Sequence, residues 1–81
     1  LPEALEEAAR RLQDGADLSE VLQQARSSLL SVGFASVEYL ELRAEKDLAP
    51  LEGLVRPARL LVAAWLGETR LIDNWPVDKK R

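Results

Sequence analysis

Residues 58–66 form the most apolar segment of the chain, and they constrain its fold more than any other stretch. Alternation in a strand places Leu60, Val62, Ala64 and Leu66 on one face and Leu61, Ala63 and Trp65 on the other. A strand that is apolar on both faces is usually central in its sheet and covered on both sides. The sequence therefore predicts a sheet with this segment at its centre and with Trp65 in the core.

A hairpin turn follows this segment. Gly67 stands at the first position of the dipeptide Gly67-Glu68, where a type II′ turn places a glycine. The next residues, Thr69 to Asn74, are then the return strand, and Pro76 ends it because proline cannot donate a hydrogen bond to a strand ladder.

The first 33 residues have a helical period instead. Apolar residues at helical spacing predict a helix from Pro2 to about Gln13, which Gly15 ends. Asp17 has the position of an N-cap, and the stripe of apolar residues after it predicts a second helix. Gly33 stands where a left-handed C-terminal cap belongs, so that two antiparallel helices joined by a short turn are expected.

A short segment rich in strand-forming residues, Val37 to Arg43, follows the helices and predicts the first strand. Residues 45–57 contain Pro50, Gly53 and Pro57, which predict a loop with at most a short helical turn around Asp47 to Leu54. The predicted fold class is α+β: residues 1–81 form a single domain, in the order α-α-β-β-β, with the helical pair on one face of a three-stranded antiparallel sheet. The other face then carries Val37, Tyr39, Leu61 and Trp65, and another domain or chain docks there if nothing in this chain covers them.

Composition excludes much catalytic chemistry. The 81 residues contain no His and no Cys, which excludes a Cys/His zinc site, a thiol nucleophile or a Ser-His-Asp triad built from this chain. A net charge of −3 argues against a nucleic-acid partner, and the absence of a long apolar run argues against a membrane protein, so a cytoplasmic location is expected. The basic run Lys79-Lys80-Arg81 is interpreted as a solvated tail. The chain begins with Leu1 instead of Met, which suggests a processed product or a piece of a longer protein.

The most unusual polar group is in the last predicted strand. Arg70, Asp73 and Asn74 cluster at the end of an otherwise apolar hairpin. In the simpler interpretation, Asp73 and Asn74 bond to the backbone and Arg70 pairs with a carboxylate such as Glu38 or Glu41. In the alternative, the three residues face a substrate cleft that another domain supplies. Glu38 and Glu41, three residues apart on a strand, are expected on opposite faces and so do not form a carboxylate pair.

The order of these segments resembles the C-terminal domain of pantothenate synthetase, also called pantoate-beta-alanine ligase. The resemblance is carried by Gly33-Phe34, by Val37 to Leu42, by Pro57 to Ala64, and most specifically by Leu66-Gly67 and Thr69-Arg70-Leu71-Ile72-Asp73-Asn74. It extends from about Leu1 to Asn74.

The resemblance implies a part of a cytoplasmic, homodimeric ligase that uses ATP and Mg²⁺ to join pantoate and β-alanine through a pantoyl-adenylate. In that family an N-terminal Rossmann-like domain holds the catalytic motifs, including a His-Ile-Gly-His segment. This chain has no His, so no catalytic, nucleotide-binding or metal-binding residue is carried over to it. The chain is then expected to be an inert lid, with Arg70, Asp73 and Asn74 as candidates for its substrate-facing side. The alternative is a freestanding interaction or dimerisation domain that uses an exposed sheet face.

Overall fold

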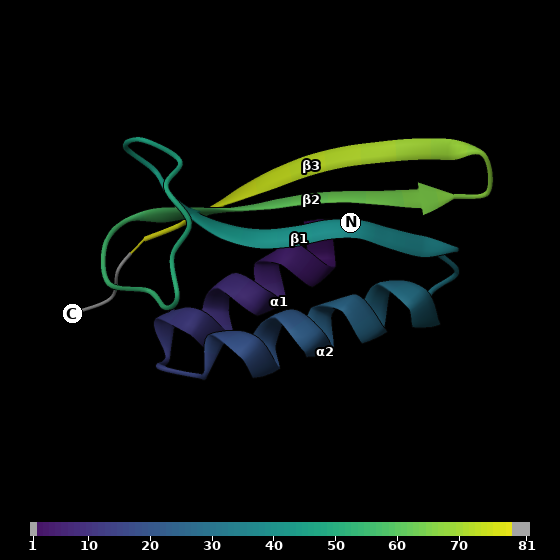
Figure 1. Ribbon diagram of the computed structural model, residues 1–81. Helices are drawn as coiled ribbons and strands as arrows, with labels where there is room; N and C mark the ends of the chain where they lie inside the picture. The colour runs from purple at the N-terminus through teal and green to yellow at the C-terminus, as the bar shows by residue number, and fades with distance from the viewer. Residues whose placement is uncertain (1, 79–81) are drawn as a thin grey trace.

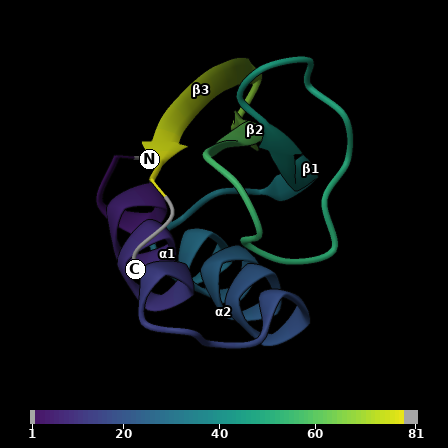
Figure 2. The ribbon, with the colours of Figure 1, turned by 90° about the vertical axis from the view of Figure 1, so that its left-hand side faces the viewer.

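The computed structural model describes residues 2–78 and contains two helices followed by three strands. Helix α1 spans Pro2–Gln13 and helix α2 spans Leu18–Ser31. Strand β1 spans Ser36–Ala44, β2 spans Ala58–Leu66 and β3 spans Thr69–Val77. Both helices lie on the same side of the sheet, which gives the two-layer α+β arrangement that the sequence predicts (Figures 1 and 2).

Each helix ends in the geometry that its glycine allows. Gly33 has a φ of +114°, and its N–H donates to Leu30 C=O while Phe34 N–H donates to Leu29 C=O. Gly15, with a φ of +93°, closes α1 in the same way. These are Schellman motifs, in which a left-handed residue lets the chain satisfy the last carbonyls of a helix and reverse direction. The Asp17 carboxylate accepts the N–H of Glu20 at 3.2 Å and begins α2, as predicted.

The sheet has the order β1-β2-β3, with antiparallel pairing on both sides of the central β2. Gly67, with a φ of +61°, forms the turn of the β2–β3 hairpin. Strand β3 is longer than predicted, because it continues through Pro76, which pairs with Arg59, to Val77. The expectation that Pro76 ends the strand is wrong for a physical reason. Strand β3 is an edge strand, and an edge strand accepts a proline at a position whose N–H would face away from its neighbour.

The loop of residues 45–57 contains no helix. The expected helical turn is reduced to one hydrogen bond, 2.8 Å long, from Leu48 N–H to Ala44 C=O. This turn spans residues 44–48 and overlaps only the start of the predicted range. Residues 49–51 instead run back along the outer edge of β1, where Leu51 N–H donates to Leu42 C=O. Leu51 and Leu54 pack against the core, so the loop covers one end of the helix-facing side.

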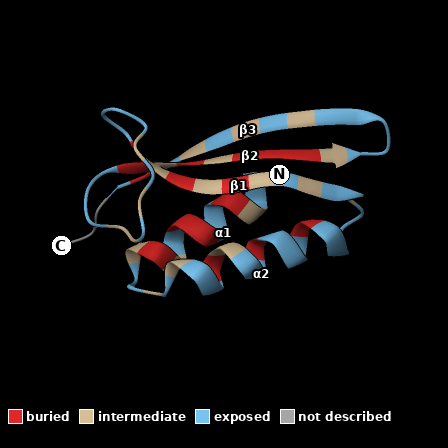
Figure 3. Cartoon of the chain, viewed as in Figure 1, coloured by how far each residue is buried: buried red, intermediate tan, exposed pale blue. Residues whose placement is uncertain are grey.

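The core lies between the helices and the sheet face that they cover (Figure 3). Its largest fully buried side chains come from both helices and from strands β2 and β3: Leu5, Val21, Leu29, Leu60, Val62 and Val77. Trp75 also packs against this core from β3. Among the described residues, no helix has the length and apolar character needed to cross a membrane. The basic run predicted at residues 79–81 lies outside the described residues.

Candidate functional site

The face of the sheet that points away from both helices is the candidate functional surface, and we call it the open face. No helix covers it in either view of the ribbon (Figures 1 and 2). The strand register and side-chain hydrogen bonds assign it these residues: Glu38, Tyr39, Glu41 and Arg43 of β1, Arg59, Leu61, Ala63 and Trp65 of β2, and Arg70, Ile72, Asn74 and Pro76 of β3.

A β-bulge in β1 determines which residues reach this face. Val37 pairs with Ala64 and Tyr39 pairs with Ala63, so that Glu38 is the extra residue between them. Alternation therefore breaks at this point, and Val37 packs toward the helix-side core instead of lying beside Tyr39. The prediction that Val37 shares a face with Tyr39 is wrong for this reason. Glu38 and Glu41, expected on opposite faces, both lie on the open face.

Glu38 is the centre of a cluster that joins all three strands. Its carboxylate accepts two hydrogen bonds from the Arg70 guanidinium, each 2.9 Å long, and one of 3.2 Å from the Trp65 indole. The bonds from Arg70, and then that from Trp65, lower the pKa of Glu38 below its ordinary value of 4.5. Glu38 also raises the pKa of Arg70. A carboxylate held in this way stays ionised near neutral pH and serves as an acceptor, not as a proton donor.

A second cluster lies at the opposite end of the open face. Arg59 donates two hydrogen bonds of 2.9 Å to the Glu45 carboxylate and one to the Asn74 side-chain oxygen. The Arg59 guanidinium lowers the pKa of Glu45, as a bidentate arginine does for the carboxylate it holds.

Arg43 completes the polar end of the face. It donates to Glu41 at 2.8 and 3.0 Å and to the carbonyl of Leu48 at 3.1 Å. The last bond ties the start of the 45–57 loop to β1.

The three predicted site residues do not form one cluster. Arg70 and Asn74 both lie on the open face but belong to different clusters, whereas Asp73 pairs with Val62 and points to the helix side. The Asp73 carboxylate accepts the N–H of Asn74 at 2.8 Å. The simpler interpretation of this segment is therefore confirmed for Arg70 and Asp73. Asn74 differs from it, because its side chain bonds to Arg59 instead of to the backbone.

Sequence reasoning underestimated Glu38 and misplaced Trp65. Trp65, expected in the core, lies half-buried on the open face with its indole N–H on Glu38. The only sequence signal for this arrangement was the apolar alternation of β2, which places Trp65 on the same face as Leu61.

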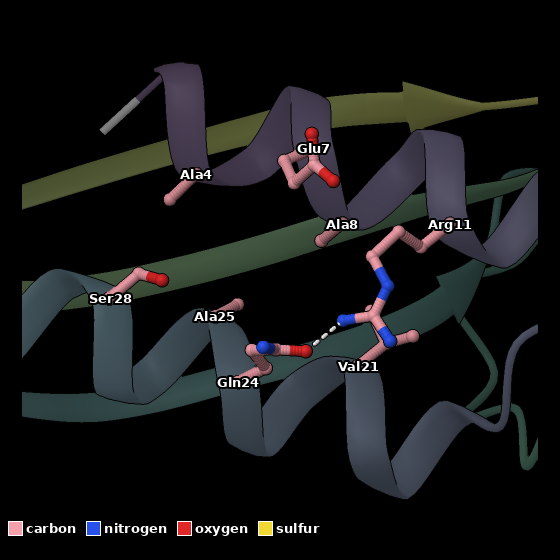
Figure 4. Close-up of a pocket in the computed structure, with 8 residues that line it drawn as sticks. All are labelled: Ala4, Glu7, Ala8, Arg11, Val21, Gln24, Ala25 and Ser28. Atoms are coloured by element: carbon pink, nitrogen blue, oxygen red, sulfur yellow. Dashed lines mark hydrogen bonds between the residues drawn. The ribbon is translucent and has the colours of Figure 1, made fainter.

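A groove of about 360 Å³ lies elsewhere, on the outer side of the helix pair (Figure 4). Small side chains form its floor, and Arg11 of α1 reaches across it to the side-chain oxygen of Gln24 on α2. Its lining consists of Ala4, Glu7, Ala8, Arg11, Val21, Gln24, Ala25 and Ser28. Among the residues that the structure describes, no three His, Cys, Asp or Glu side chains gather as metal ligands, in this groove or elsewhere.

Comparison with known proteins identifies what this arrangement belongs to. The family model of pantoate-beta-alanine ligase matches residues 1–76. The pantothenate synthetase of Chelativorans sp. is 64% identical over 77 residues, which are 95% of this chain and 27% of that protein. The pantothenate synthetase of Paracoccus denitrificans is 54% identical over 74 residues, 91% of this chain and 26% of that protein.

Solved structures agree with the sequence comparisons. A crystal structure of pantothenate synthetase from Thermus thermophilus superimposes with a TM-score of 0.77 at 32% identity, over 94% of this chain and 28% of that chain. A second structure of the Thermus thermophilus enzyme gives a TM-score of 0.80 at 33% identity, over 96% of this chain and 28% of that chain.

The fold and its open face therefore define a small α+β module of the kind found within larger biosynthetic ligases. The chain belongs to the pantoate-beta-alanine ligase family, and it spans about a quarter of the length of the curated relatives it matches.

Proposed function

We propose that this chain is the C-terminal, lid-forming domain of a pantothenate synthetase, a single domain without activity of its own. One observation carries the proposal: the family match covers residues 1–76, yet the chain spans 27% of its Chelativorans relative. A module of this size accounts for one part of such an enzyme. The sequence resemblance supports the C-terminal position, and the absence of His from the chain supports a catalytic domain elsewhere.

The proposed parent enzyme is a cytoplasmic homodimer that activates pantoate with ATP and Mg²⁺. The pantoate carboxylate attacks the α-phosphate of ATP, which releases pyrophosphate and forms pantoyl-adenylate. The amine of β-alanine then attacks the acyl carbon, and AMP leaves as pantothenate forms. An acyl-adenylate is hydrolysed readily, so a domain that closes over the site and excludes water protects the intermediate.

This chain contributes a rigid covering body to that reaction. We assign no ATP or Mg²⁺ ligand to it, because Arg43, Arg59 and Arg70 on the open face are each paired with a carboxylate. Arg70 and Asn74 remain our candidates for the side of the lid that faces substrate. Asp73 stays a candidate as well, on the helix side of the sheet instead of the open face.

A graft tests the proposed function. The matching 77-residue stretch of the Chelativorans pantothenate synthetase is replaced by this chain, and a second variant carries a deletion of that stretch. We expect the graft to form pantothenate from ATP, pantoate and β-alanine, and the deletion variant to lose the activity. The 81-residue chain by itself serves as the inertness control.

Four results contradict the proposal. The first is an inactive graft that is nevertheless folded, and the second is a deletion variant that keeps its activity. The third is turnover by the 81-residue chain alone, which would refute its inertness. A host whose matching stretch lies at its amino end would refute the C-terminal position.

A further inference from the structure

The open face has the wrong chemistry for a surface that remains in water. An antiparallel sheet that faces solvent on one side usually alternates apolar residues inside with polar residues outside. Here β2 presents the half-buried Leu61 and Trp65 to that side, with the fully buried Ala63 between them, and β1 adds the half-buried Tyr39. Ile72 of β3 lies beside them with 62% of its surface exposed. Among the described residues, these side chains form an apolar patch that stays partly exposed.

Charged groups surround this patch, and they neutralise one another. The three arginines Arg43, Arg59 and Arg70 are paired with three glutamates, Glu41, Glu45 and Glu38. A face with its charges already paired offers no free guanidinium to hold a phosphate or a nucleic acid. An apolar centre with a polar border instead resembles the anatomy of a protein–protein interface.

The area of the open face can be compared with the areas of two kinds of interface, between separate chains and between domains of one polypeptide. Three strands of nine residues form a sheet of roughly 30 by 14 Å, about 400 Å², given the usual rise and spacing of strands. A stable complex of separate chains buries about 800 Å² on each partner, about twice this footprint. Domains of one polypeptide associate over interfaces that begin at about 600 Å² in total, or about 300 Å² per side. A face of this size is sufficient for a contact between domains of one polypeptide.

The polypeptide that could occupy it is absent from this chain. About three quarters of the length of the matched Chelativorans relative lies outside the stretch that this chain covers. We propose that the open face, centred on Tyr39, Leu61 and Ile72, is the surface that docks against the remaining part of the same pantothenate synthetase polypeptide. This inference rests on the proposed function and adds to it the face of the lid that makes the contact.

Chemical labelling of single cysteines tests the docking surface. The chain has no cysteine, so Ile72→Cys introduces one thiol on the open face, midway along the edge strand β3. Val32→Cys is the matched control, since Val32 is another β-branched residue, 73% exposed, at the end of α2 on the helix side of the molecule. Both variants are prepared as the 81-residue chain and in the Chelativorans graft. Iodoacetamide labelling is then located by peptide mass spectrometry, so that cysteines of the host do not interfere.

We expect the two thiols to react at similar rates in the 81-residue chain. In the graft, labelling at the Ile72→Cys position slows by about tenfold or more, as it does for a site that is open for a tenth of the time or less. Labelling at the Val32→Cys position stays unchanged. Equal labelling of both positions in the graft overturns the proposal. Protection of the Ile72→Cys thiol in the isolated chain that grows with protein concentration also overturns it, because a second copy then occupies the face.

The two proposals fail in different ways. Activity of the unmodified graft tests the proposed function, and labelling of the folded graft, isolated by size-exclusion chromatography, tests the docking surface. An active graft with an unprotected Ile72→Cys thiol removes the docking surface alone. An inactive graft with a protected thiol removes the proposed function and leaves the contact in place.

Discussion

At the scale of single residues, Glu38 contributes most to the arrangement of the open face. It is the extra residue of the β-bulge, and its carboxylate joins β1 to β2 and β3 through Trp65 and Arg70. Sequence alternation alone could not predict this, because a bulge shifts every residue on one side of it to the other face. Pairing of Arg70 with a nearby carboxylate was predictable from residue type, whereas its geometry depended on the bulge.

The first prediction concerns the protonation of Glu38. Its pKa lies below 4.5 chiefly because Arg70 donates to it, so Arg70→Gln raises the pKa of Glu38 toward 4.5. A carboxyl whose pKa is lower in the folded than in the unfolded chain stabilises the fold above the unfolded value. That contribution is lost as the pH falls through the folded value. The variant therefore loses stability relative to the unmodified chain near neutral pH, and the difference disappears in acid.

Carboxyl ¹³C NMR titration measures this pKa directly. Glu45 provides the internal control, because its pKa is lowered by Arg59 in a separate cluster and stays low in the Arg70→Gln variant. A Glu38 pKa that does not move on removal of Arg70 would show that the ion pair is not the cause of the shift.

At the scale of elements, the sequence predicts best what short-range chemistry determines. Asp17, Gly15 and Gly33 mark the helix ends correctly, and the Gly67 turn pairs β2 with β3. Prediction was poorer where a distant contact decides. Residues 49–51 pair with the edge of β1, and Pro76 is accepted because β3 has no further neighbour. Neither fact is present in the local pattern of residues.

The Gly33 cap gives the prediction at this scale. A Cβ at Gly33 meets no other atom within 4 Å, so the cost of Gly33→Ala comes from the left-handed backbone alone. We expect a loss of about 1 kcal/mol, which lowers the melting temperature of a domain of this size by about 5 °C. Gly53→Ala is the matched control, because Gly53 also has open space but is not among the positive-φ residues. Equal melting temperatures for the two variants would contradict the role of Gly33 as a cap.

At the scale of the whole molecule, the fold has two layers, the helices and the sheet, whereas the apolar β2 is suited to a sheet covered on both faces. The apolar alternation of β2 predicted a strand covered on both sides, and the structure covers one. The composition of β2 could not show which face the helices choose. That choice follows from the bulge, from the packing of α1 against β3, and from the position of Trp75 on the helix side.

Substitution of two neighbouring leucines of β2 tests the difference between the covered and the open face of the sheet. Leu60 is fully buried under the helices, and Leu61 is half-buried on the open face. In the isolated chain, Leu60→Ala should cost roughly 3 kcal/mol through lost burial and a cavity, a large part of the roughly 5 kcal/mol available to so small a domain. Leu61→Ala should cost about 1 kcal/mol, because the side chain remains partly in water before the change. Urea unfolding followed by circular dichroism gives both values.

In the Chelativorans graft, a docked open face desolvates Leu61 as well, so the cost of Leu61→Ala should rise toward that of Leu60→Ala. An unchanged cost of Leu61→Ala in the graft would mean that the sheet keeps one wet face in the complete enzyme.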